Sequence, residues 1–156
     1  MGFFDLLAVV GSSGSFYSGP DAGSEAIAGK TMIVEATNIG DIGTPGHFDL
    51  LIPGGGIGIN YGCAQAWGIP DRNDPDLGAE RGGLLADCKA QNSDHAAIKS
   101  CMRDSCQRLF GERNLTDMMD SCIWFVDWFE AADNPEFIYQ EIDCPQELRS
   151  VSGSHR

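Results

Sequence analysis

Four short apolar stretches of the chain contain β-branched or aromatic residues and predict strands. Residues 30–37 are β-branched and partly alternate between apolar and polar positions. Residues 47–53 form a second apolar stretch that ends at a proline, residues 123–129 are rich in aromatics, and residues 137–142 alternate again. We therefore predict four short strands, which glycine- and proline-rich loops separate.

One segment instead shows helical spacing. Its apolar positions, which recur about every 3.6 residues, are Ile98, Met102, Leu109 and Phe110. The spacing predicts a helix over residues 94–110, with Ser93 or Asp94 as its N-terminal cap and Gly111 at its end. A shorter helical turn is predicted over residues 115–119. Short strands with one helical insertion indicate a mostly-β barrel rather than a doubly wound α/β fold.

A run of glycines interrupts the strand pattern. Residues 54–59, Gly-Gly-Gly-Ile-Gly-Ile, contain too much glycine for the interior of a regular strand. Such a run indicates close approach of another backbone or a sharp bend. A phosphate-binding loop does not fit, because no Gly-Lys-Ser/Thr sequence follows and no helical pattern begins there.

The net charge narrows the classes of partner. The 156 residues include 23 acids and 10 bases, which gives a formal net charge of -13. Nucleic acid and anionic membranes are disfavoured, because both attract positively charged surfaces. No apolar run in the sequence approaches the roughly 20 residues that span a bilayer. A neutral or cationic partner is expected.

The cysteine content indicates an oxidising compartment. The six cysteines are Cys63, Cys88, Cys101, Cys106, Cys122 and Cys144. This number is high for a cytosolic protein and ordinary for a secreted one. Paired C-x-x-C ligands are missing and the histidines lie far apart, so we expect disulfides and no metal. Their pairing stays open. Secretion is expected although residues 1–10 lack the basic start of a signal peptide.

Asp41, His47 and Asp49 form the polar cluster of greatest chemical interest. Alternation along residues 47–53 places His47 and Asp49 on one face of the predicted strand. Asp49 then either faces solvent, which is the simpler interpretation, or is partly desolvated and held protonated. The second state suits a general acid, which must still carry its proton at the working pH.

The sequence from Gly46 to Ile59 strongly resembles glycoside hydrolase family 45, the small fungal-type endoglucanases. Its His-Phe-Asp-Leu-Leu-Ile-Pro stretch and the glycine run that follows carry the resemblance. Further segments that resemble the family are residues 18–20, 28–34, 122–130, 132–135 and 144–148. The resemblance covers most of residues 18–149, and several separate motifs in the right order make it specific.

The resemblance implies a double-psi β-barrel with long loops that cleaves internal β-1,4-glucosidic bonds with inversion. It places the general acid at Asp49, a supporting role at His47 and an assisting loop aspartate at Asp41. Inversion requires an acid and a base about 6.5–9.5 Å apart, so that a water molecule fits between the base and the sugar. The resemblance implies no cofactor.

One family motif is missing from the sequence. The family's base lies in an N-terminal strand with a Tyr-Trp-Asp-Cys-Cys-type motif, which this chain does not contain. We therefore expect N-terminal barrel strands to be missing and hydrolysis by this chain to be weak or absent. The expected organisation is an atypical segment at 1–17, a partial barrel at 18–149 and a flexible tail at 150–156, with a helical insertion at about 84–120.

Two disulfides also follow from the resemblance. An Arg-x-x-Cys motif that ends at Cys106 resembles a family motif whose partner falls on Cys122. Cys88 and Cys101 would then form an extra bridge that stabilises the insertion. A disulfide typically contributes about 2–4 kcal/mol of stability.

The aromatic residues suggest roles in packing and binding. Trp124 and Trp128 are expected to pack in the core or in the barrel, and Trp67 either lines a sugar cleft or packs in the core. The expected partner is cellulose or another β-1,4-glucan, bound by a secreted, extracellular monomer that contacts no nucleic acid and no membrane. Two alternatives stay open. An inactive expansin-like protein would bind cellulose or loosen cell walls without hydrolysis, and a truncated, non-functional fragment would not close the barrel.

Overall fold

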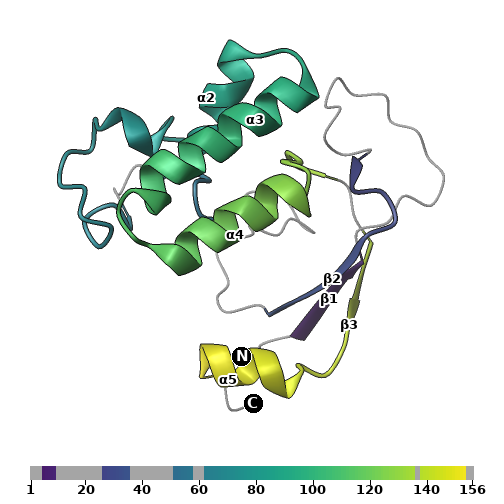
Figure 1. Cartoon of the computed structure of the whole chain (residues 1–156). Coiled ribbons are helices and arrows are strands. Elements are labelled where there is room, and N and C mark those ends of the chain that lie inside the picture. The colour runs from purple at the N-terminus through teal and green to yellow at the C-terminus, as the bar shows by residue number, and fades with distance from the viewer. Residues whose placement is uncertain (1–4, 10–25, 36–50, 58–61, 136–137, 154–156) are drawn as a thin grey trace. The chain divides into compact units, whose positions relative to one another are not determined.

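The computed structural model describes residues 5–9, 26–35, 51–57, 62–135 and 138–153. These residues belong to two compact units (Figure 1). Unit 1 combines both ends of the chain, residues 1–49 and 134–156, whereas unit 2 is the continuous stretch 50–133. The predicted organisation, with a partial barrel domain over residues 18–149, stays a prediction.

Unit 1 contains an antiparallel sheet of three strands in the order β2-β1-β3. The strands are β1 (Asp5–Val9), β2 (Thr31–Glu35) and β3 (Ile138–Glu141). Leu7 is in register with Ile33 of β2, and Leu6 with Glu141 of β3. The strands predicted at 30–37 and 137–142 are confirmed, and β1 adds a strand that the sequence pattern did not predict.

The C-terminal helix of unit 1 is α5 (Gln146–Ser152). It ends at Gly153, which has a φ of 73° and so suits a left-handed helix terminus. Ser152 Oγ donates to the carboxylate of Glu35 at 3.0 Å, which ties the helix to the end of β2. The helix thus includes the first three residues of the segment that was predicted as a flexible tail.

Unit 2 is mainly helical. Its elements are the 3-10 helix η1 (Pro75–Leu77), α2 (Gly83–Gln91), α3 (His95–Cys106), the π-helical turn η2 (Gln107–Gly111) and α4 (Thr116–Asp127). Helix α3 packs against both α2 and α4 (Figure 1). The largest side chains that are essentially inaccessible to solvent in this core are Ile69, Leu77, Cys88, Met102, Cys106, Leu109, Phe110, Cys122, Val126 and Phe129.

The helix predicted over residues 94–110 is confirmed as α3 and η2. Asp94 caps it, because its carboxylate accepts from the amide of Ala97 at 2.9 Å. Three of the four predicted stripe residues, Met102, Leu109 and Phe110, are fully buried. The helical path ends at Gly111, as the sequence predicts.

The strand predicted over residues 123–129 is wrong. Residues 123–127 form the end of α4. Cys122, Phe125 and Val126 of this helix are buried, and so is Phe129 just after it. These positions follow the i, i+3, i+4, i+7 spacing of a helix face. Trp124 and Trp128 therefore do not pack in a barrel strand. Their rings stack with centroids 5.2 Å apart, and Trp124 is 39% exposed.

The predicted mostly-β, double-psi barrel is not confirmed by the described residues. Their strands form the three-stranded sheet of unit 1, and the helical region of unit 2 runs from Gly83 to Asp127, beyond the insertion predicted at 84–120. Within the described part of the chain, none of the helices has the length and apolar character needed to cross a membrane.

Candidate functional site

The three residues predicted for catalysis, Asp41, His47 and Asp49, lie outside the described residues. The next residue that the structure describes is Leu51, two positions after Asp49. Unit 2 begins at Leu50, immediately after the predicted acid. The candidate site is therefore built from the unit 2 residues that follow the His-Phe-Asp motif.

A glycine turn follows this motif. The amide of Gly55 donates to the carbonyl of Ile52 at 3.0 Å. Gly54 and Gly56 have φ angles of 88° and 105°, in a region that residues with a Cβ rarely adopt. The bend predicted from the glycine run is confirmed at these residues.

Backbone contacts hold this turn against the start of α2. The amide of Leu84 donates to the carbonyl of Gly54 at 2.8 Å. A Cβ on Gly83 would lie 2.0 Å from the Gly54 oxygen and 2.2 Å from the Gly56 nitrogen. A Cβ on Gly54 would lie 3.4 Å from Cys122 Sγ. The chain that leaves the predicted acid is thus anchored to the helical core of unit 2.

Trp67 lies at the edge of that core. Its ring meets the ring of Phe110 edge-on, with centroids 5.1 Å apart and planes at 83°. Phe110 is fully buried and Trp67 is half-buried, so part of the indole stays in contact with solvent. Trp67 therefore packs on the core, and its role in sugar binding stays a prediction.

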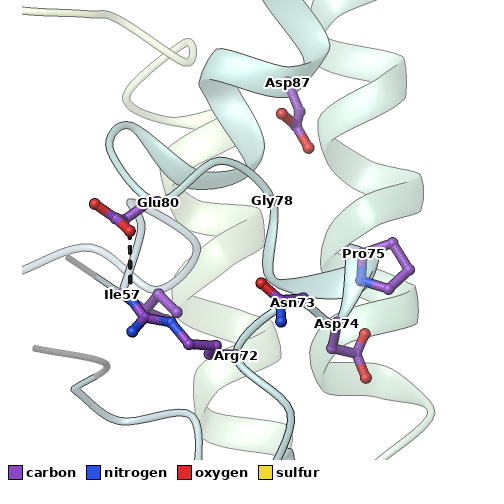
Figure 2. Close-up of a pocket in the computed structure, with 8 residues that line it drawn as sticks. All are labelled: Ile57, Arg72, Asn73, Asp74, Pro75, Gly78, Glu80 and Asp87. Carbon is purple, nitrogen blue, oxygen red and sulfur yellow. Dashed lines mark hydrogen bonds and ion pairs between the residues drawn. The ribbon is translucent and has the colours of Figure 1, made fainter. Parts of the chain in front are cut away.

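Unit 2 also contains a pocket of about 350 Å³ (Figure 2). Its walls come from the end of the glycine turn, the segments on both sides of η1, and α2. The lining residues are Ile57, Arg72, Asn73, Asp74, Pro75, Gly78, Glu80 and Asp87. Three carboxylates and one guanidinium make this lining polar and acidic.

Two of the three pocket carboxylates are engaged within the protein. Asp74 accepts from the amide of Asp76 at 2.9 Å, and Glu80 pairs with Arg72 at 3.4 Å. The third, Asp87, is half-buried, and among the described residues its carboxylate has no hydrogen-bond or ion-pair partner. Sequence reasoning missed Asp87, because a lone aspartate inside a helix belongs to no recognisable motif.

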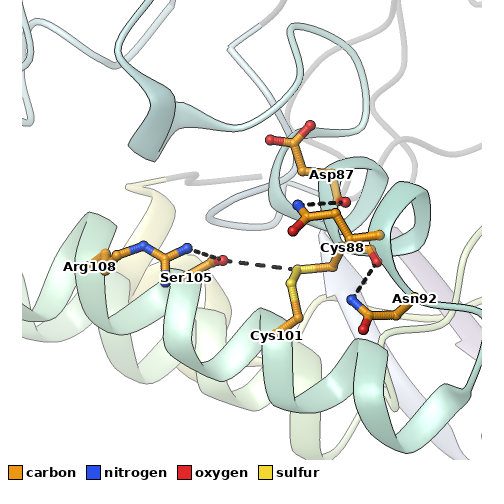
Figure 3. Close-up of a disulfide and its surroundings, with 7 residues drawn as sticks. Asp87, Cys88, Asn92, Cys101, Ser105 and Arg108 are labelled. Atoms are coloured by element: carbon orange, nitrogen blue, oxygen red, sulfur yellow. Dashed lines mark hydrogen bonds between the residues drawn. A yellow bond between two sulfur atoms is a disulfide. The ribbon is translucent and has the colours of Figure 1, made fainter.

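Both predicted disulfides are confirmed, as Cys88–Cys101 and Cys106–Cys122. Cys88 follows Asp87 on α2, so the first bridge joins α2 to α3 next to the pocket. Figure 3 shows the Asp87 carboxylate directed away from this bridge. The cysteines outside both bridges are the exposed thiol of Cys63 in unit 2 and the buried Cys144 in unit 1.

Replacing both Cys106 and Cys122 by alanine is expected to lower the free energy of unfolding of unit 2 by about 3 kcal/mol or more. The bridge closes a segment with a sequence separation of 16, and both sulfurs are fully buried, so its removal also leaves a cavity. Urea unfolding followed by tryptophan fluorescence measures this loss, because all three tryptophans lie in unit 2.

The matched control for this prediction is the double alanine variant of Cys88 and Cys101. Its bridge has a similar sequence separation, 13, but Cys101 is only half-buried. A smaller loss of stability is therefore expected from the control. A larger loss from the control would contradict the argument from burial.

Comparisons with known proteins agree with these motifs. The family model of glycosyl hydrolase family 45 matches residues 13–155. Endoglucanase B of Cellvibrio japonicus is 49% identical over 148 residues, which are 92% of this chain. An endoglucanase of the springtail Cryptopygus antarcticus is 34% identical over 127 residues, or 81% of the chain.

The structure is also similar to the crystal structure of a cellulase from the Antarctic springtail Cryptopygus antarcticus. The TM-score is 0.60 at 29% sequence identity, and the match covers 95% of this chain and 53% of that one. The chain spans 28% of the Cellvibrio protein and 46% of the springtail endoglucanase. With a family match over nearly its whole length, the chain belongs to glycosyl hydrolase family 45.

Proposed function

We propose that the chain acts as an endo-β-1,4-glucanase that cleaves internal bonds of cellulose or a related glucan. The family match over residues 13–155 carries this proposal, because it includes the complete His-Phe-Asp and glycine-run motif. The endoglucanase names of the relatives support it. The two disulfides support a secreted protein, since such bridges persist in oxidising compartments.

In the proposed mechanism, Asp49 protonates the leaving glycosidic oxygen. His47 orients or supports this carboxyl group, and Asp41 assists from the preceding loop. A water molecule attacks the opposite face of the sugar, which inverts the anomeric centre. The motifs in this sequence assign no second carboxylate as the base that would activate this water, so slow hydrolysis is expected.

The described residues that follow Asp49 in the sequence support this proposal. The turn at Gly54–Gly56 is bonded to the start of α2, only a few positions after the proposed acid. Such anchoring suits catalysis, because an acid must be held close to its productive geometry. The partly exposed ring of Trp67 is proposed to stack on a sugar ring of the substrate.

The test is incubation of the full chain with a soluble β-1,4-glucan. We expect reducing ends to appear slowly while viscosity falls early, because internal bonds are cut. Proton NMR of the fresh products should show the α-anomer first, as inversion of a β-linkage requires. The absence of new reducing ends would overturn the proposal, and cellulose binding without hydrolysis would favour the expansin-like alternative.

A further inference from the structure

The pocket in unit 2 has the size and the chemistry of a site for a small polar ligand. Its volume of about 350 Å³ lies at the lower end of the range for ligand pockets, about 300–1,000 Å³. Such a space suits a single sugar ring better than a larger molecule. Ile57, one of its lining residues, lies eight positions after Asp49 in the sequence and directly follows the anchored glycine turn.

Asp87 gives the pocket an acceptor that no other described residue uses. An ionised carboxylate only accepts hydrogen bonds, so its natural partners are N–H or O–H donors. Arg72, the cation in the lining, is paired with Glu80. Glucosyl hydroxyls are neutral donors, and hydrogen bonds from them to a carboxylate are charge-assisted and strong.

Asn73 complements this acceptor from another wall of the pocket. Figure 2 shows the Asp87 side chain directed from α2 toward the segment that carries Asn73. The amide and the Nδ2 of Asn73 both donate to Asp71 Oδ1, at 2.9 and 3.3 Å. These bonds fix the side chain and leave its Oδ1 as a further acceptor for a hydroxyl.

Both groups are held on rigid structure before any ligand arrives. Asp87 lies on α2 next to Cys88, whose disulfide to Cys101 fixes α2 against α3 (Figure 3). Asn73 is in a turn that Asp71 and Asp74 stabilise through bonds to backbone amides. Preorganised groups lose little conformational entropy on binding, which favours specific recognition.

We propose that Asp87 and Asn73 form a glucosyl-binding subsite, which binds the hydroxyl groups of one sugar residue in a β-1,4-glucan. The inference rests on the proposed function for the class of ligand. It adds a binding site whose residues all belong to unit 2 and differ from those proposed for proton transfer.

The test is calorimetric titration of the full chain with cellohexaose, in an Asp49→Asn background that suppresses turnover. Adding Asp87→Asn is expected to raise the Kd about tenfold, which corresponds to the loss of one hydrogen bond to a charged group. Asn73→Ala should raise it by a smaller factor. Asp104→Asn is the matched control, because it removes the same charge from an exposed position on α3 and should leave the Kd unchanged.

Each outcome separates this inference from the proposed function. Hydrolysis by the wild-type chain together with an unchanged Kd in Asp87→Asn overturns the inference alone. Binding that depends on Asp87 without hydrolysis overturns the proposed function and supports the subsite. No binding of cellohexaose overturns the subsite. So does a titration in which Asp87→Asn removes binding of Ca²⁺ but not of the sugar. An unchanged melting temperature confirms that each variant is folded.

Discussion

Replacing Asp49 by asparagine is expected to lower the rate of reducing-end release from a soluble β-1,4-glucan at least about 100-fold. Asparagine has nearly the same shape as aspartate, but its amide is not acidic enough to transfer a proton to the leaving oxygen. General acid catalysis by a positioned side chain typically contributes about 10²–10⁴-fold to the rate. The measurement is the initial rate at saturating glucan for the wild-type chain and for Asp49→Asn.

A substrate that needs no acid distinguishes proton donation from a structural role. An aryl cellotrioside with a dinitrophenolate leaving group departs without protonation, so Asp49→Asn should retain most of the wild-type rate on it. Asp120→Asn, at an exposed position of α4, is the matched control and should not change either rate. Equal losses on both substrates would contradict the assignment of Asp49 as the acid.

Replacing Gly83 by alanine is expected to destabilise unit 2 by about 2–5 kcal/mol. Its φ of 52° is left-handed, which costs a residue with a Cβ about 1–2 kcal/mol. The new Cβ would also lie 2.0 Å from the Gly54 oxygen, and overpacking of this kind adds about 1–3 kcal/mol. The contact is with backbone atoms, so no side-chain rotation relieves it. Urea unfolding followed by tryptophan fluorescence measures the loss.

Gly68→Ala separates the two contributions. Gly68 also has a left-handed φ, 80°, but a Cβ there would meet nothing within 4 Å. We expect a loss of only about 1–2 kcal/mol in this control. Similar losses in the two variants would show that the close approach between the glycine turn and α2 contributes nothing to stability. A loss of hydrolysis in Gly83→Ala alone would link the anchored turn to the proposed acid.

Local signals correctly predicted α3 with η2 and the strands β2 and β3. The stripe from Ile98 to Phe110 and the capping Asp94 specify one helix, because spacing and cap agree. The error at residues 123–129 arose because aromatic and β-branched residues favour strands, although their burial follows a helical face. Packing of Phe125 and Phe129 into the core decided the outcome there, and local preference did not.

Those parts of the candidate site that belong to a sequence motif, or to the resemblance to the family, could be predicted. The glycine run predicted the bend at Gly54 and Gly56, because few other residues adopt the positive φ angles found there. The disulfides followed from the resemblance, since spacing alone leaves many pairings open. Asp87 and its pocket could not be predicted. They arise from segments around residues 57, 73 and 87, which only the folded chain brings together.

The division of the chain also sets an order for folding during synthesis. Unit 2 is one continuous stretch, so all of its residues have been made once residue 133 has been added. The sheet of unit 1 has β1 at its centre, and Leu6 pairs with Glu141, so it cannot be completed until residue 141 has been made. Pairing between such distant segments is slow and leaves a strand edge exposed meanwhile. Strand β1 therefore stays without its partner β3, and prone to aggregation, while the helical unit and its disulfides can already form.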